Sequence, residues 1–416
     1  MSADIVFLVP GFLGFERAGN FGNFADRVCS ALRTQLEGRL ETQVRVVPLG
    51  SLPTTSFAAR QEELLRALHY HVQASPELER IHLVGHSVGG VDAHLLACEE
   101  PLESASWAHI DPHGLVQKLR SVVTLAAPHA GTCLAAAPGA GALSLSAIVD
   151  DPSGLKQMVE LVNKLLRSAM RDVRASHGSA GLWREYRKVK HFMAELMRWQ
   201  SFLPALTPDA MEQLYARMEP RSDVVRRSFV TVAGVPRNTT APASAPDSFF
   251  EELARRCSGS GNGFTRHSPR VRDALVQVRA ALDDPARTIA GRDTRPPPHL
   301  DAQSNDGLVN SARQLMRSDS PDELVAVVLA DHFDVLGYYD RGLGVSGPDA
   351  DDVAVSGLLH SGSAFRDTEF FALYRRVADV VAQQCTAPRA AKSASAPPAT
   401  GKRVTKRTPS RRPSAS

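Results

Sequence analysis

Residues 81–90 of the chain, I-H-L-V-G-H-S-V-G-G, decide the fold. The first four residues have strand-forming character and lead directly into the pattern G-x-S-x-G, and a helix-forming run at 88–98 follows it. A strand, a sharp turn and a helix in this order are typical of a nucleophile elbow, in which Gly85 and Gly89 lack the β-carbons that would crowd a strained serine. The sequence therefore predicts that Ser87 is a nucleophile at the end of a strand.

Short apolar segments alternate with helix-like segments on both sides of this motif. Such alternation predicts an α/β fold with a mostly parallel central sheet that is flanked by helices, and ligands then bind at the carboxyl ends of the strands. The expected strands are 4–9, 44–48, 81–84, 122–126, 229–233 and 324–330, and the expected helices are 23–38, 56–73 and 88–98.

The length and composition fit one large domain with an insertion. A chain of 416 residues, 43% of them hydrophobic, can bury a substantial core. We expect the core to consist of two parts, 1–140 and 226–385, with a helical cap inserted at 141–225 and a basic tail at 386–416.

Cysteine spacing and the missing motifs restrict the class of protein. The five cysteines are far apart and never form a C-x-x-C pair, which indicates reduced thiols and neither a disulfide framework nor a zinc site. The first residues, M-S-A-D-I-V-F-L-V-P, have no basic region, and no segment has the roughly 18 apolar residues of a membrane span. We therefore expect a cytoplasmic protein. Because H-E-x-x-H, a Walker lysine loop and clustered Cys and His ligands are missing, we expect neither a catalytic metal nor nucleotide chemistry.

The positive net charge of the chain comes from its carboxyl-terminal tail. The formal net charge is +3, but residues 389–416 carry eight Lys or Arg and no acid, so the rest of the chain carries −5. The tail is rich in Ser, Pro, Ala and Thr and has almost nothing to bury, which predicts disorder. It could tether the protein to an anionic membrane or to nucleic acid, or it could simply be a solvated tail.

The expected cap contains two candidate amphipathic helices, 155–173 and 183–200. An aromatic and methionine surface on the second is of the kind that lines a pocket for long apolar substrates. These side chains could equally seal the cap onto the core, and the two roles are compatible. The candidate substrate-binding residues are Phe192, Met193, Leu196 and Trp199.

A serine nucleophile needs a histidine base and a carboxylate that orients it, and in the elbow class these follow in the order acid, then histidine. His332 directly follows the strongly apolar strand L-V-A-V-V-L-A, so it is the candidate base. Asp306 lies in the turn-forming context S-N-D-G and is the candidate acid, with Asp301 as its rival.

An oxyanion hole needs two backbone N–H groups that converge on the developing negative charge. One is expected from Val88, the residue after the nucleophile, and the other from the loop after the first core strand. That loop is V-P-G-F-L-G, in which Gly11 permits a close turn and Phe12 presents its amide.

The chain resembles the α/β-hydrolase superfamily and, within it, the lipases and esterases. The resemblance rests on four segments: F-L-V-P-G-F-L-G near the start, V-G-H-S-V-G-G, L-A-A-P-H-A-G-T, and N-D-G-L-V together with D-H-F-D-V. The last pair is similar to bacterial true lipases, whose catalytic acid and histidine fall on Asp306 and His332. The oxyanion loop departs from the usual H-G, because this chain has P-G there, as in the lecithin acyltransferase-like branch.

The resemblance implies a serine carboxylic-ester hydrolase that cleaves lipid-like esters through an acyl-enzyme on Ser87. Acyl transfer and phospholipid cleavage use the same triad and remain alternatives, as does a catalytically silent binding protein with the same fold. In bacterial true lipases the aspartate two positions after the histidine can bind a structural calcium. This would implicate Asp334, which could otherwise be solvated or salt-bridged, and no other cofactor is implied.

Overall fold

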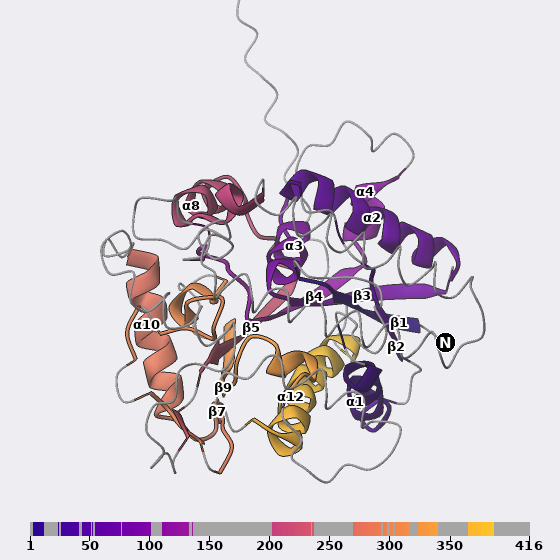
Figure 1. The fold of residues 1–416 in the computed structure, drawn as a ribbon. Helices are drawn as coiled ribbons and strands as arrows, with labels where there is room; N and C mark the ends of the chain where they lie inside the picture. Colours follow the sequence, from indigo (N-terminus) through magenta and orange to yellow (C-terminus); the bar gives the residue numbers. More distant parts are fainter. Residues whose placement is uncertain are drawn as a thin grey trace, which may run out of the picture. The chain divides into compact units, whose positions relative to one another are not determined.

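A computed structural model of the chain gives the arrangement of its elements (Figure 1). The described residues belong to one compact unit, Met1–Thr386. They are 3–11, 24, 26–40, 44–50, 52, 55–75, 77–100, 110–132, 135, 202–233, 235–236, 269–292, 294–297, 300–302, 304–316, 323–339 and 365–386.

The described part of the chain contains a seven-stranded sheet with the order β2-β1-β3-β4-β5-β9-β7. Every pairing in this sheet is parallel, so the carboxyl ends of its strands lie at one edge. The strands are β1 (Ala3–Val9), β2 (Val44–Pro48), β3 (Leu78–His86), β4 (Leu119–Leu125), β5 (Val225–Val232), β7 (Thr288–Ile289) and β9 (Leu324–Leu329). A separate antiparallel pair joins β6 (Val235–Pro236) and β8 (Thr294–Arg295).

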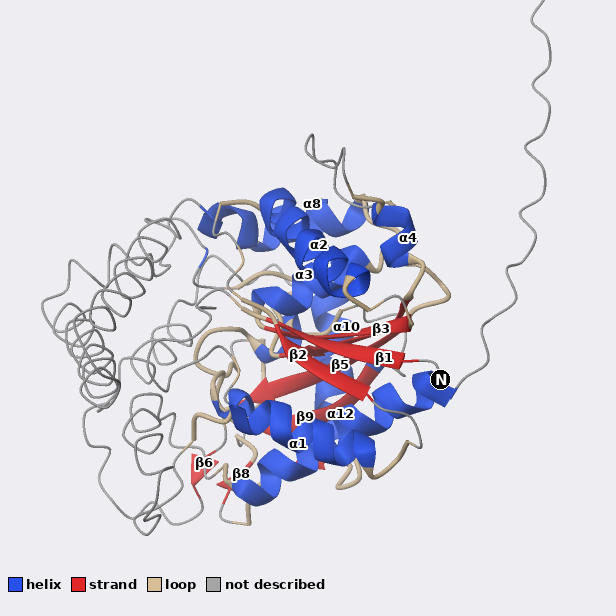
Figure 2. Cartoon of the chain, turned by 90° about the vertical axis from the view of Figure 1, so that its right-hand side faces the viewer, coloured by secondary structure: helices blue, strands red, loops and turns tan. Residues whose placement is uncertain are grey.

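Helices cover both faces of the sheet, and Figure 2 shows α1 and α12 on the face opposite α2, α3 and α4. The helix α10 packs on β5 and β9 through a further apolar cluster. None of the helices in the described part of the chain has the length and apolar character that a membrane crossing needs. The helices are α1 (Asp26–Glu37), α2 (Phe57–Gln73), α3 (Val88–Leu96), α4 (Pro112–Val116), α8 (Pro208–Ala216), α10 (Pro269–Leu282) and α12 (Asp367–Thr386).

Polar side chains fix where several helices begin. The Ser56 hydroxyl accepts a hydrogen bond from the backbone N–H of Ala59 at the start of α2, and Asp111 does the same for Gly114 at the start of α4. Thr207 caps α8 in the same way. Each cap satisfies a backbone donor that has no partner within its helix, and proline at the first position of α4 and α8 loses no helical hydrogen bond.

The predicted α/β fold with a mostly parallel sheet is confirmed, and so is every predicted strand. The strand predicted at 81–84 is longer, running from Leu78 to His86, and the helix predicted at 88–98 ends at Leu96. The short strand β7 was not predicted, because two residues give no measurable periodicity. Most of the expected cap and all of 387–416 lie outside the described residues, so the expected domain boundaries stay predictions.

The close approach of α3 to the sheet depends on glycine. A β-carbon on Gly85 would lie 2.4 Å from the backbone oxygen of Gly89, and one on Gly89 would lie 2.3 Å from the backbone oxygen of Pro10. Both distances are far shorter than a van der Waals contact, and the atoms that would have to move are backbone atoms. The glycines of G-x-S-x-G therefore allow α3 to begin directly against β1 and β3.

We predict that Gly89→Ala lowers the free energy of unfolding by about 1–3 kcal/mol or more, because its methyl group overlaps the Pro10 carbonyl. Gly38→Ala is the matched control, since a β-carbon there makes only an ordinary 3.5 Å contact with Thr34. Urea denaturation of both variants measures the difference. Equal free energies of unfolding for Gly89→Ala and Gly38→Ala would show that α3 can move away from the sheet at little cost.

Candidate active site

Ser87 has the backbone conformation expected of a nucleophile elbow. Its φ of 54° and ψ of −133° place a residue with a β-carbon in the left-handed half of conformational space, which is strained. Its backbone N–H donates to the Leu125 carbonyl at 2.9 Å, so β4 holds the turn in place. Within residues 81–98, Ser87 alone is partly exposed, and all the others are buried.

The loop after β1 runs directly over Ser87. A β-carbon on Gly11 would lie 2.8 Å from the Ser87 β-carbon, so the loop can approach this closely only with glycine. Val88, one of the two expected oxyanion donors, is the first residue of α3 and is buried. Phe12, the other expected donor, lies outside the described residues, so its role stays a prediction.

A buried ion pair ties this loop to the elbow helix. Arg60 on α2 and Asp92 on α3 are both 0% exposed, and the Arg60 Nη2 atom lies 2.7 Å from Asp92 Oδ2. The same guanidinium donates to the Pro10 carbonyl at 3.2 Å. Burial raises the pKa of Asp92, and the Arg60 charge opposes that shift. One cation therefore links α2, α3 and the loop that passes Ser87.

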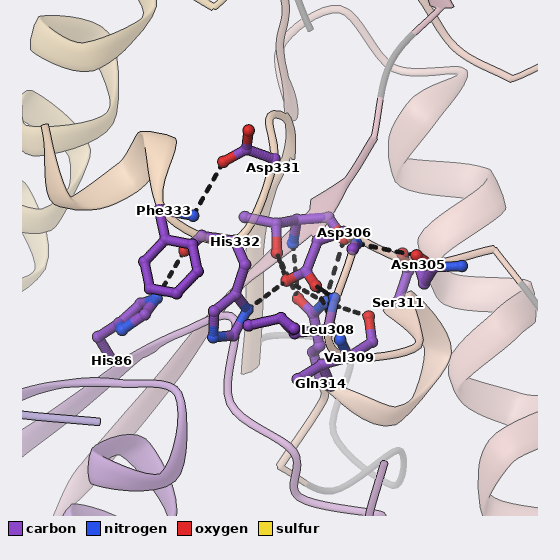
Figure 3. Close-up of polar contacts among 12 residues, drawn as sticks. His86, Asn305, Asp306, Leu308, Val309, Ser311, Gln314, Asp331, His332 and Phe333 are labelled. Carbon is purple, nitrogen blue, oxygen red and sulfur yellow. Dashed lines mark hydrogen bonds and ion pairs between the residues drawn. The ribbon is translucent and has the colours of Figure 1, made fainter. Parts of the chain in front are cut away.

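Asp306 and His332 form a hydrogen-bonded pair, which Figure 3 shows. The His332 Nδ1 atom lies 2.8 Å from Asp306 Oδ2, and both side chains are almost fully buried. Because a carboxylate can only accept, Nδ1 carries the proton of a neutral His332 ring, and Nε2 then has a free lone pair. A neutral imidazole held in this tautomer can act as a general base.

Both oxygens of the Asp306 carboxylate accept hydrogen bonds from described residues (Figure 3). Oδ1 accepts the backbone N–H groups of Leu308 at 3.0 Å and Val309 at 2.8 Å. Oδ2 accepts the Thr231 hydroxyl at 2.6 Å and the Gln314 amide at 3.0 Å, in addition to His332. Such a complete set of donors compensates for the burial of a charged carboxylate.

The rival carboxylate has a different environment. Asp301 is exposed, and its Oδ1 atom accepts the Ser304 backbone N–H at 2.9 Å. That contact closes a local turn, whereas the His332 ring contacts Asp306. Of the two candidates, the structure therefore brings Asp306 to the histidine.

His86 connects the end of β3 to the loop that carries His332. Its Nε2 atom donates to the His332 carbonyl at 2.8 Å, and the two ring centroids are 4.6 Å apart. Burial, together with the nearby His332 ring, holds the pKa of His86 well below its usual range, so it stays neutral. Because His86 immediately precedes Ser87, this contact places the serine's strand beside the histidine's loop.

The two aspartates that flank His332 shape its loop. Asp331 Oδ1 accepts the backbone N–H groups of Phe333 and Asp334, both at 2.9 Å, and Asp334 Oδ2 accepts the Asp331 N–H at 2.9 Å. Among the described residues, Asp334 belongs to no group of three metal-ligating side chains. These contacts of the two carboxylates shape the turn, and a calcium-binding role of Asp334 stays a prediction.

Several residues at the site were not predicted. Arg60 contacts Asp92 at 32 positions along the chain, Thr231 contacts Asp306 at 75, and Gln314 contacts Thr231 at 83. No local motif marks these residues. His86 had a signal, because it occupies the variable position of G-x-S-x-G. The four cap residues Phe192, Met193, Leu196 and Trp199 lie outside the described residues and stay predictions.

We predict that Asp306→Asn costs stability as well as function. The amide can accept on one side only, so its NH₂ group must face donors that now lack an acceptor, at about 1–3 kcal/mol for each buried group. Asp301→Asn is the control, because an exposed amide oxygen can still accept from Ser304. Urea denaturation should show a loss for Asp306→Asn and a change within about 0.5 kcal/mol for Asp301→Asn. Equal losses in the free energy of unfolding for the two variants would contradict this set of donors around Asp306.

No protein-family model matches the sequence, and no curated protein matches it. Among solved structures, the chain is similar to EstA from Clostridium botulinum, with 18% identity, 86% of this chain and 87% of that chain covered, and a TM-score of 0.44. It is also similar to the lipase of Staphylococcus hyicus, with 16% identity, 92% and 96% covered, and a TM-score of 0.45. Lipase 1 from Pelosinus fermentans gives 16% identity, 92% and 99% covered, and a TM-score of 0.47. The strand order and the Ser87 elbow show that the chain has the α/β-hydrolase fold.

Proposed function

We propose that the protein is a serine carboxylic-ester hydrolase that forms an acyl-enzyme on Ser87. The observations that carry this proposal are the buried Asp306–His332 hydrogen bond and the strained, partly exposed conformation of Ser87. The His86 contact supports the same grouping, since it joins the residue before Ser87 to the His332 backbone. Ser87 directly follows β3, His332 follows β9, and Asp306 accepts a hydrogen bond from Thr231 near the end of β5. The three residues therefore belong to the edge where ligands bind in open α/β folds.

In the proposed mechanism His332 Nε2 takes the proton of the Ser87 hydroxyl as Oγ attacks the ester carbonyl carbon. The resulting imidazolium is stabilised by the Asp306 carboxylate. His332 then returns the proton to the departing alcohol, and the carbonyl re-forms as the acyl-enzyme. The hydrogen bonds that Asp306 accepts keep its carboxylate in one orientation throughout these steps.

The tetrahedral intermediate places a negative charge on the former carbonyl oxygen. We assign its stabilisation to the backbone N–H groups of Val88 and Phe12. Val88 lies at the amino-terminal end of α3, where unpaired N–H groups and the helix dipole favour an anion. The close passage of Gly11 over Ser87 supports a second donor from the next residue of that loop.

A second nucleophile completes the reaction. Water, activated by His332, attacks the acyl-enzyme and releases a carboxylic acid, and this is hydrolysis. An alcohol in place of water gives acyl transfer, and a phospholipid in place of a simple ester gives phospholipase activity. All three use the same residues, and we propose hydrolysis of lipid-like esters because the 183–200 segment offers apolar side chains for a long acyl group.

We predict that a fluorophosphonate probe labels the wild-type chain on Ser87 and does not label Ser87→Ala. Ser87→Ala and His332→Ala should each lower kcat for nitrophenyl esters by about 10⁴- to 10⁶-fold, because triad members act as a unit. Mass spectrometry of the labelled peptide and steady-state kinetics measure both effects.

The control for this experiment is Ser30→Ala, which replaces an exposed hydroxyl on α1 that bonds only within its own helix. Ser30→Ala should be labelled by the probe and should keep the wild-type kcat for nitrophenyl esters. Wild-type protein that is folded but neither labelled nor active would refute the proposal and favour a catalytically silent binding protein.

A separate prediction concerns substrate length. If Leu196 and Trp199 line an acyl pocket, each additional methylene should contribute up to roughly 0.8 kcal/mol, or about fourfold in kcat/KM, until the pocket is full. Leu196→Ser should flatten that increase and spare acetate esters. We would measure kcat/KM against acyl chain length for both proteins, with thermal melting alongside. Equal losses on acetate and decanoate esters would instead mean that Leu196 seals the cap onto the core.

A further inference from the structure

Three metal-ligating side chains meet near the amino ends of the strands, away from the edge that carries Ser87. They are Asp4 on β1, His82 on β3 and Cys385 in the last turn of α12. One potential ligand atom from each lies within 4.8 Å of the others, and all three residues are buried. Within the described residues this is the one such group, and the mechanism proposed above does not use it.

The strand register explains why these residues meet. Asp4 pairs with Arg80, and Val6 pairs with His82, so Asp4 and His82 are two positions apart on one face of the sheet. Ser121 on β4 is the partner of His82 on its other side. The helix α12 packs on this face, and its last turn brings Cys385 to the pair. Strand alternation and helix docking therefore give the group a fixed geometry.

Asp4 is a buried carboxylate with too few partners. It is 1% exposed, and neither oxygen accepts a well-formed hydrogen bond, although the Cys385 thiol lies close enough to interact with it. The nearest cationic atom is Arg80 Nη1 at 3.6 Å from Oδ2. Asp306, in contrast, receives a full set of donors.

His82 is oriented as a ligand. Its Nδ1 atom lies 2.8 Å from the Ser121 hydroxyl, and its Nε2 atom lies 3.5 Å from the Cys385 sulfur. When Nδ1–H donates to Ser121, Nε2 presents its lone pair to the Asp4 and Cys385 side. The His82 ring is 0% exposed, and such burial favours its neutral form. Metal-bound histidines are held in this way by a hydrogen bond from the other ring nitrogen.

The separation of sulfur and nitrogen fits a tetrahedral metal. Zinc binds sulfur at about 2.3 Å and nitrogen at about 2.0–2.1 Å, and tetrahedral angles then place the two ligand atoms about 3.5 Å apart. The His82 Nε2 to Cys385 Sγ distance is 3.5 Å. A thiolate, an imidazole and a carboxylate together favour zinc over magnesium or calcium, which prefer oxygen ligands.

We propose that Asp4, His82 and Cys385 bind one zinc ion that joins the first strand and the last helix of the folded unit to β3. Binding replaces the Cys385 thiol proton, which leaves to solvent, and the charges of the thiolate and the Asp4 carboxylate balance the two charges of the ion. One position of the tetrahedron remains for water or for the second Asp4 oxygen. The carboxyl-terminal end of α12 carries a partial negative charge that also favours a cation.

Arg80 is the competing cation. Its guanidinium lies near Asp4 and also donates to the Cys385 carbonyl, so it can serve as the counterion when no metal is bound. Its side chain is 24% exposed and can move outward, whereas Asp4 is 1% exposed and cannot. The proposal therefore requires only a shift of the Arg80 side chain.

Cobalt binding to the full chain tests the proposal, because a thiolate–cobalt bond gives a charge-transfer band in the near ultraviolet. We expect chelator-treated wild-type protein, kept reduced, to show this band, to saturate with one equivalent of Co²⁺ and to lose it to Zn²⁺. Zinc should also raise Tm, since the ion binds the folded state only. Cys385→Ser should lose the band and the rise in Tm.

Cys29→Ser is the matched control, because Cys29 is a half-buried free thiol on α1 outside this group. It should keep the band, and so should Ser87→Ala, which separates this proposal from the proposed activity. A wild-type chain without the band, or a band that survives in Cys385→Ser, would overturn the assignment.

If Cys385→Ser does not fold, the cobalt affinity of Asp4→Asn tests the site instead. The amide keeps the shape of the carboxylate and removes its charge. Cobalt affinity should fall at least about tenfold in this variant. Unchanged affinity in Asp4→Asn would exclude Asp4 as a ligand and overturn the three-residue site.

Discussion

The contact between the start of α3 and the backbone of β1 and β3 is the constraint on which the rest of the structure depends. It exists because Gly85 and Gly89 have no β-carbon, and a methyl group on either would overlap backbone atoms at 2.3–2.4 Å. The short turn forces Ser87 to a φ of 54°, a strain of about 1–3 kcal/mol that the surrounding packing offsets. As a result, the partly exposed Ser87 hydroxyl lies at the edge of a buried sheet, directly before the amino terminus of α3.

Three loops must then hold fixed positions relative to Ser87, and each loop is held by a different interaction. The loop after β1 is fixed by the Arg60 guanidinium through the Pro10 carbonyl, the loop with Asp306 by its donors, and the loop with His332 by the His86 ring. These contacts are buried, where water does not compete with them, so they position side chains more sharply than exposed contacts do. Asp306 and His332 are thereby held in one orientation, as the proposed mechanism requires.

The sequence predicts the elements with strong local signals and misses the contacts between distant residues. The elbow, the strands and the pairing of Asp306 with His332 could be predicted because each has a motif or an apolar run at a defined place along the chain. The Arg60–Asp92 ion pair and the Gln314 contact could not, because charged and amide side chains occur everywhere and spacing says nothing about partners that are 32 and 83 residues away. The proposed metal group is equally hidden in the sequence, since Cys385 and His82 are 303 residues apart.

The opposite ends of the sheet thus have different physical requirements. At the carboxyl edge, the backbone strain of Ser87 costs stability, so the loops there depend on a rigid sheet beneath them. Toward the amino edge, β1 and α12 close the folded unit, and a poorly compensated Asp4 carboxylate there weakens the junction unless a cation neutralises it. Because β1 leads directly into the loop over Ser87, whatever fixes β1 against β3 and α12 also fixes the position of Pro10 and Gly11. Stability at one edge of the sheet is in this way a condition for geometry at the other.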